Sequence, residues 1–128
     1  MINEDLQVQL DAGVATLMLS VLVSDNELMA FFGSSRYSAL FLMQALLICE
    51  QRPGLSKEEC LHIGRDLRSR THRQNFIDEA IKQGFFAKEK SATDARQVVV
   101  YPTAKTKRLF NDLSAASRDK VRAVFAAE

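Results

Sequence analysis

The sequence predicts a mainly α fold that contains one small β-hairpin. Two observations carry this prediction. Apolar residues recur at intervals of three and four over most of the chain, which is the spacing of a helix face. Between residues 85 and 101 this period gives way to two β-prone runs separated by a polar turn. The 128 residues fit one domain. We expect 36–102 to form its centre, with 1–35 and 103–128 supplying flanking helices.

Three helices are expected before Pro53. The first spans about residues 3–23, and its apolar stripe consists of Leu6, Leu10, Val14, Leu17 and Val21. A short helix over 26–32 could be capped by Asp25. A third helix over 36–51 is apolar nearly all round, which favours a central, buried position.

A tight pair of helices is predicted next. Ser56 followed by Glu59 forms a capping box, which starts a helix that we expect to run to about Leu67. Ser69 is the next cap candidate, for a helix over 70–83. Gly84 is placed to end that helix in the left-handed conformation.

The hairpin and a last helix complete the chain. Strands are expected over 85–90 and 96–101, around the turn 91–95. Pro102 and Thr103 then start a C-terminal helix, with a candidate break near 113–117. A helix pair followed by a hairpin is the layout of a winged helix-turn-helix.

In such a motif the front of the second helix enters the DNA major groove. That segment is almost entirely hydrogen-bonding, and consists of Ser69, Arg70, Thr71, His72, Arg73, Gln74 and Asn75. Arg can pair with guanine, and Gln or Asn with adenine. A helix that is merely solvated usually shows a polar face along its whole length, whereas here apolar residues begin only at Phe76. Either His72 or Arg73 could also turn inward, one turn before Phe76 and Ile77.

Lys88, Lys90 and Arg96 border the hairpin turn, where a wing would reach a flanking minor groove. Charges that only keep the hairpin soluble are the alternative. The charge distribution favours DNA. Residues 52–108 carry thirteen basic and seven acidic side chains, whereas residues 1–51 carry one basic and six acidic ones. A basic surface supplies most of the non-specific affinity for DNA, although a basic face can also lack a partner.

Other function classes find little support. We expect no enzyme and no cofactor, because the chain lacks a Gly-rich phosphate loop and a nucleophile motif. Two histidines and two cysteines without a Cys-x-x-Cys pair make no convincing metal site. Cys49 and Cys60 are expected to be small buried hydrophobes, with a redox-sensing thiol as the alternative. No apolar stretch is long enough for a membrane span and the start lacks a basic leader, so we expect a cytoplasmic protein.

The runs Gly84–Lys90 and Asp94–Lys105 resemble the wing of MarR-type bacterial transcription regulators. The resemblance covers roughly residues 39–110. It implies that Arg96 reaches DNA and that Asp94 helps to hold the wing. The segment between Ser56 and Ser69 is about two residues longer than the family's usual spacing, and Arg73 stands where the family often has a small β-branched residue.

The family dimerises through its first and last helices, and the apolar stripes of 3–23 and of the C-terminal helix agree with this. Paired subunits would place two recognition helices about 34 Å apart on a pseudo-palindromic site. The resemblance also implies a small-molecule effector, and Arg36 and Tyr37, at the start of the helix over 36–51, are candidate pocket residues. Helix capping and surface packing are the alternative explanation for these two residues. The predicted function is that of a homodimeric transcription regulator that binds double-stranded DNA at a specific sequence. The family resemblance favours a repressor over an activator. The alternative is a winged-helix module that binds another protein.

Overall fold

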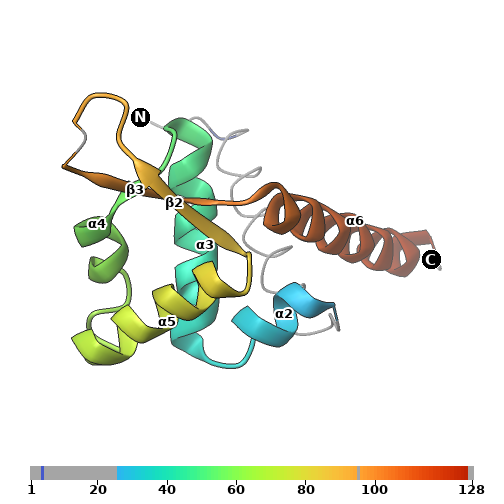
Figure 1. Cartoon of the computed structure of the whole chain (residues 1–128). Coiled ribbons are helices and arrows are strands. Elements are labelled where there is room, and N and C mark those ends of the chain that lie inside the picture. Colours follow the sequence, from blue (N-terminus) through green and yellow to red (C-terminus); the bar gives the residue numbers. More distant parts are fainter. Residues whose placement is uncertain (1–3, 5–25, 95, 127–128) are drawn as a thin grey trace.

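The structure is a computed structural model and describes residues 4, 26–94 and 96–126 (Figure 1). The expected helix over 3–23 lies outside the described residues, apart from Glu4. The expectation that Asp25 caps the next helix is wrong, because the N-cap is Asn26, whose side chain accepts from the backbone N–H of Met29 at 3.0 Å. The described elements are α2 (Glu27–Phe32), α3 (Arg36–Gln51), β1 (Leu55–Ser56), α4 (Lys57–His62), α5 (Arg70–Lys82), β2 (Phe86–Lys90), β3 (Val98–Pro102) and α6 (Ala104–Ala126). This order is the predicted one, with the addition of β1.

The three strands form one antiparallel sheet in the order β1-β3-β2. Val100 at the centre of β3 pairs with Lys88 on one side and with Leu55 on the other. The predicted hairpin is therefore confirmed, and β1 adds a third, two-residue strand from the segment just before α4. Helices α3, α4 and α5 together with this sheet make a winged helix-turn-helix fold (Figure 1).

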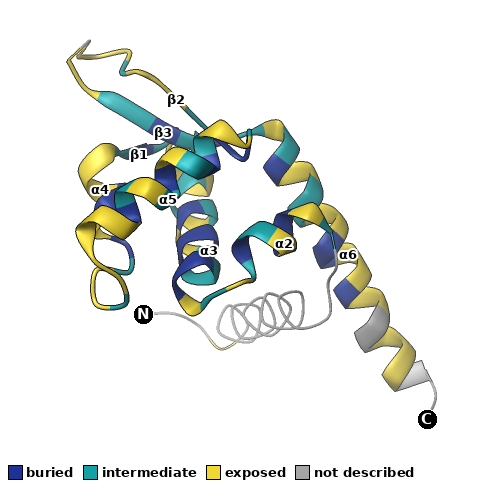
Figure 2. Cartoon of the chain, turned by 60° about the horizontal axis from the view of Figure 1, so that its bottom comes forward, coloured by how far each residue is buried: buried dark blue, intermediate teal, exposed yellow. Residues whose placement is uncertain are grey.

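Aromatic rings occupy the centre of the core. Phe41 of α3 is fully buried and lies with its ring centroid 5.6 Å from that of Phe76 and 5.3 Å from that of Phe86. Phe32 of α2 contacts the same two rings at 5.7 and 5.9 Å. All four pairs of rings meet edge to face, the arrangement that aromatic quadrupoles favour. The core thus joins α2, α3, α5 and β2 (Figure 2).

Helix α3 is central, as its apolar sequence predicts, but it is not buried all round. Tyr37, Phe41, Leu42 and Ala45 are buried. Leu47 on another face is 55% exposed. The helix begins at Ser35, whose side chain accepts from the backbone N–H of Ser38 while the Ser38 hydroxyl accepts from that of Ser35.

Helix α6 is continuous from Ala104 to Ala126, so the expected break near 113–117 is wrong. The buried Leu113, Ser114 and Ser117 lie within the helix at that place. Beyond them α6 extends away from the helix-turn-helix (Figure 1). No helix in the described ranges is long and apolar enough to cross a membrane.

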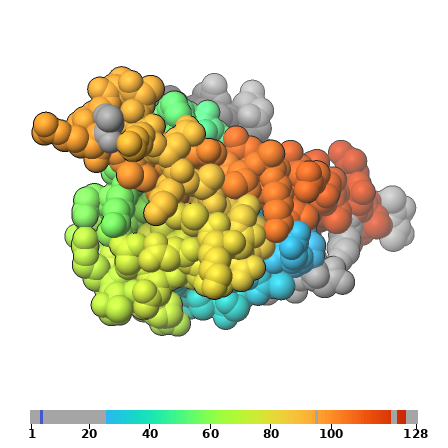
Figure 3. Space-filling view, in the orientation of Figure 1, coloured from blue at the N-terminus to red at the C-terminus, as the bar shows by residue number. Residues whose placement is uncertain are grey.

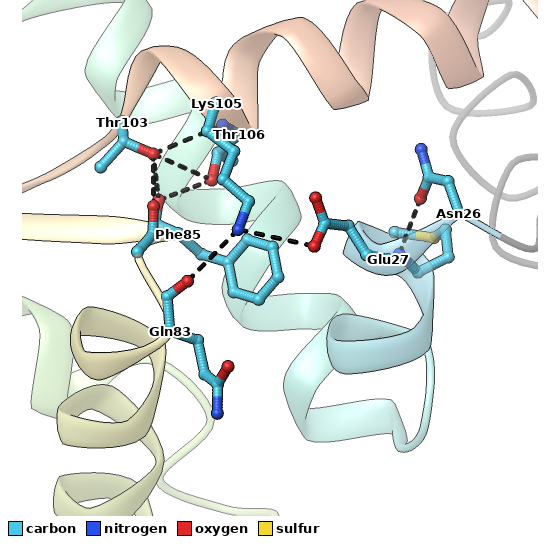
Figure 4. Close-up of polar contacts among 9 residues, drawn as sticks. Asn26, Glu27, Gln83, Phe85, Thr103, Lys105 and Thr106 are labelled. Carbon is cyan, nitrogen blue, oxygen red and sulfur yellow. Dashed lines mark hydrogen bonds and ion pairs between the residues drawn. The ribbon is translucent and has the colours of Figure 1, made fainter.

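The base of α6 is tied to the end of α5 by side-chain contacts (Figure 4). Thr106 is fully buried, and its hydroxyl donates to the carbonyl oxygen of Phe85 at 2.6 Å. Thr103 donates to the Gly84 carbonyl at 2.7 Å. Lys105 lies over the Phe85 ring at 4.6 Å and pairs with Glu27 of α2 at 3.5 Å. These contacts fix the start of α6 against α2 and against the residues that follow α5.

Candidate nucleic-acid interface

Helix α4 begins as predicted and ends early. The Ser56 hydroxyl accepts from the backbone N–H of Glu59, and the Glu59 carboxylate accepts from that of Ser56, so the capping box is confirmed. Arg52 pairs with Glu59, and this contact is the main cause that lowers the pKa of the Glu59 carboxyl. The expectation that the helix continues to Leu67 is wrong, because α4 ends at His62.

The chain leaves the helical conformation at Ile63, the C-cap, and Gly64 follows it in the turn. Its φ of +73° lies in the left-handed region, where glycine carries no steric cost. A Cβ added there would lie 2.4 Å from Cδ1 of Tyr37, so the backbone of the turn rests directly on the tyrosine ring. Residues 63–68 form a connection of turns between α4 and α5, in which the backbone N–H of Leu67 donates to the Gly64 carbonyl at 2.9 Å. This connection is in keeping with the longer spacing seen in the sequence.

Helix α5 begins and ends as predicted. The Ser69 hydroxyl accepts from the backbone N–H of His72 at 3.1 Å, which makes Ser69 the N-cap. The helix runs from Arg70 to Lys82, one residue short of the predicted end. Gly84 follows with a φ of +82°, which confirms the left-handed stop.

The predicted contact residues on the front of α5 divide into three groups. Arg70, Thr71, His72 and Asn75 are exposed together with the cap residue Ser69. Gln74 is half-buried, and its amide donates to the Asp78 carboxylate at 3.0 Å. Arg73 alone turns inward.

Arg73 is 9% exposed, and its Nε–H donates to the carbonyl oxygen of Arg68 at 3.1 Å. The guanidinium thus braces the α4–α5 turn from behind and is not on the outer surface. The expectation that Arg73 contacts DNA is therefore corrected, since helical spacing places this side chain on the same inward face as Ile77 and Ala80. His72, the other candidate for turning inward, stays exposed with its ring 5.8 Å from that of Tyr37.

The wing carries its charges outward. Lys88 and Lys90 are exposed on β2, two residues apart and so on one face of the strand. Arg96 is exposed in the turn before β3. The Asp94 carboxylate accepts from the backbone N–H of Arg96 at 3.0 Å, a contact within the turn of the wing.

The fold brings the exposed residues at the front of α5 and the cations of the wing to one end of the molecule. Figure 1 shows the wing and the N-terminal end of α5 on the side opposite the C-terminal end of α6. The space-filling view agrees, with the orange wing projecting above the yellow-green surface of α4 and α5 (Figure 3). The exposed front of α5 and the wing therefore form one candidate interface.

The α4–α5 turn adds two cations that the sequence analysis did not single out. Arg65 and Arg68 are exposed on the turn, immediately before the N-terminus of α5. The sequence feature that could have identified them is their position in the lengthened segment just before the predicted second helix of the pair. A third missed feature is an ion pair in which Arg70 contacts Glu58 of α4 at 3.0 Å.

A groove of about 820 Å³ lies between α3 on one side and α4 with the α4–α5 turn on the other. Arg36 and Leu40 line it from α3, whereas Tyr37 is not a lining residue, which corrects half of the expectation for an effector pocket. Tyr37 is 1% exposed, its hydroxyl finds no partner within the described structure, and burial is the main cause that raises its pKa to about 12.

The two cysteines differ in burial. Cys60 is fully buried, and burial is the main cause that raises its pKa to about 12. Cys49 is half-buried, and burial raises the pKa of its thiol as well. Within the described ranges no three His, Cys, Asp or Glu side chains gather in a way that could hold a metal ion.

No protein-family model matches the sequence, and no curated protein matches it either. Among solved structures, the chain is similar to MarR at 13% identity and a TM-score of 0.48, over 91% of this chain and 82% of MarR. It is also similar to the adhesin competence repressor AdcR from Streptococcus pyogenes, at 19% sequence identity and a TM-score of 0.45, over 95% of this chain and 80% of AdcR.

A third likeness is to a SlyA-like transcription regulator from Listeria monocytogenes, at 20% identity and a TM-score of 0.45, over 89% and 70% of the two chains. Identities and TM-scores at this level support no statement about what this chain binds.

Proposed function

We propose that this chain is a sequence-specific regulator of transcription that binds double-stranded DNA through α5 and the wing. The single observation that carries the proposal is the shared exposure, at one end of the fold, of the polar front of α5 and the wing cations Lys88, Lys90 and Arg96. The N-terminal part of a recognition helix meets base edges, while wing and turn cations meet phosphates or a minor groove.

The side chains on α5 suit the major groove. Arg70 has guanidinium donors for the O6 and N7 acceptors of guanine, and Asn75 can give and accept hydrogen bonds with adenine. Both are exposed and carried by a helix with a firm N-cap at Ser69. The exposed cations Arg65, Arg68, Lys88, Lys90 and Arg96 would supply the salt-dependent affinity for the backbone.

We further propose that two copies act together. The distal part of α6 extends beyond the helix-turn-helix, and Val124 near its end is 67% exposed. A second copy would cover this apolar side chain and the apolar stripe that the sequence shows over 3–23. Such a homodimer would bind a pseudo-palindromic site with half-sites about one DNA turn apart.

A repressor role is proposed on the sequence resemblance to MarR-type regulators alone. The groove beside Arg36 is the proposed place for a small-molecule effector.

Selection of bound fragments from the source genome, followed by mobility-shift assays at about 100 mM salt, tests the proposal. We expect the selected fragments to share one motif with two half-sites. We also expect sedimentation equilibrium to give the protein a mass of two chains. Failure to shift any selected or genomic fragment would overturn the DNA-binding function and favour a winged-helix module that binds an acidic protein. A motif without internal symmetry would overturn the homodimer.

A further inference from the structure

The first residue of the recognition helix is held by an acidic side chain of the helix before it. Nη2 of Arg70 lies 3.0 Å from Oε1 of Glu58, across the gap between α5 and α4. The Arg70 side chain is 65% exposed and that of Glu58 is 75% exposed. Exposed ion pairs contribute little to stability, so this contact is easily broken.

Glu58 has no part in the cap of its own helix. The capping box of α4 is made by Ser56 and Glu59, and Glu59 also takes the contact with Arg52. Glu58 lies between them in the first turn and directs its carboxylate to Arg70. A negative charge therefore lies beside the first cation of α5, on the face that we propose for DNA.

This charge distinguishes the two kinds of contact that Arg70 can make. A phosphate that approaches Arg70 carries a full negative charge and meets the Glu58 carboxylate beside it, which repels it. A guanine edge offers O6 and N7, which are neutral acceptors, to the guanidinium donors that Glu58 does not occupy. The pair thus disfavours contact with the backbone and leaves contact with a base available.

Resting on the proposed function, we propose that Glu58 is a specificity-determining residue of the DNA interface and acts through Arg70. Its carboxylate penalises binding in which Arg70 meets only phosphate, as happens on DNA of arbitrary sequence. It also holds the guanidinium at the front of α5, which lowers the conformational cost of meeting a base in the proper site.

The test is Glu58→Gln, which removes the charge and keeps the size of the side chain. Dissociation constants are measured at one salt concentration on the selected site and on a duplex of scrambled sequence. We expect the variant to bind the scrambled duplex roughly two- to fivefold more tightly, the range set by one exposed ion pair. The selected site should change less, so that the ratio of the two constants falls. An unchanged ratio would overturn the inference.

Two further variants separate this mechanism from general repulsion. Asp66→Asn removes an exposed carboxylate from the neighbouring turn and should leave the ratio unchanged. In an Arg70→Ala background, Glu58→Gln should no longer alter the ratio, because the two residues act as one unit. If the effect persisted without Arg70, Glu58 would act by direct repulsion and the inference would be wrong.

The failure of the inference is distinguishable from that of the proposed function. A wild-type protein that binds neither duplex would overturn both. A wild-type protein that prefers its selected site, with a Glu58→Gln variant that keeps the same preference and the same melting temperature, would overturn the inference alone.

Discussion

The guanidinium of Arg73 donates its Nε–H to the carbonyl oxygen of Arg68 at 3.1 Å. This hydrogen bond joins the inward face of α5 to the last residues of the turn before it. Arg68 is exposed on that turn, and the same turn leads into the cap residue Ser69. A buried arginine thereby fixes the place at which α5 begins.

Replacing Arg73 by Met should separate folding from binding. The variant keeps an unbranched side chain in the same space but loses the charged donor, so we expect the free energy of unfolding to fall by about 1–2 kcal/mol. Urea denaturation measures the loss. The matched variant Arg70→Met removes an exposed arginine three residues earlier and should leave stability within about 0.5 kcal/mol while weakening DNA binding. Equal losses of stability in the two variants would contradict the bracing role.

The features that sequence analysis predicted are those decided by local chemistry. Ser56 and Ser69 cap α4 and α5 because their hydroxyl groups satisfy backbone N–H groups three residues on, a requirement visible in the sequence itself. Gly84 ends α5 because glycine tolerates a positive φ. The hairpin followed from β-prone residues on either side of a polar turn.

The features that the sequence did not reveal depend on contacts between distant segments. Strand β1 has only two residues, and it exists because Leu55 meets Val100 of β3, 45 positions away. Helix α4 ends at His62, and Gly64 in the turn that follows packs on Tyr37, a contact that no local pattern reveals. The inward turn of Arg73 was one of two alternatives in the sequence, and only the packing of α5 decided between Arg73 and His72.

Asn75 should contribute more to sequence preference than Gln74. Asn75 is exposed, whereas the Gln74 amide is half-buried and bonded to Asp78 at 3.0 Å. Asn75→Ala is expected to reduce the discrimination at one base pair of each half-site by about 1–3 kcal/mol. Binding to a set of singly substituted sites measures it, with Gln74→Ala as the matched comparison. A uniform loss over all sites would mean that Asn75 contacts phosphate.

Arg96→Ala should weaken binding to every sequence by a similar factor. The side chain is exposed on the wing, where Asp94 fixes the backbone of the turn. If Arg96 neutralises one phosphate, the slope of log affinity against log salt should become smaller by about 1. Titrations at several salt concentrations give this slope. Arg118→Ala, an exposed arginine on α6, serves as the control and should leave the slope unchanged. An unaltered slope for Arg96→Ala would refute the wing contact.

Stability should fall at alkaline pH because of Cys60. Its thiol is fully buried, and the pKa is raised from its ordinary value of 9.0 to about 12. The unfolded chain therefore ionises this thiol first, so the free energy of unfolding is unaffected below pH 9 and decreases between pH 9 and about 12. One group with this shift contributes a slope of about 1.4 kcal/mol per pH unit within that window.

Urea denaturation between pH 8 and 11 measures the slope in the wild type and in Cys60→Ala. The variant will be less stable at pH 8, because it leaves a small cavity in the core. Its stability should nevertheless decline less steeply above pH 9, and the two curves should converge. Cys49→Ala is the comparison, since the Cys49 thiol is only half-buried. Parallel curves for the wild type and Cys60→Ala would show that the alkaline loss of stability comes from other groups, with the buried Tyr37 as the next to test.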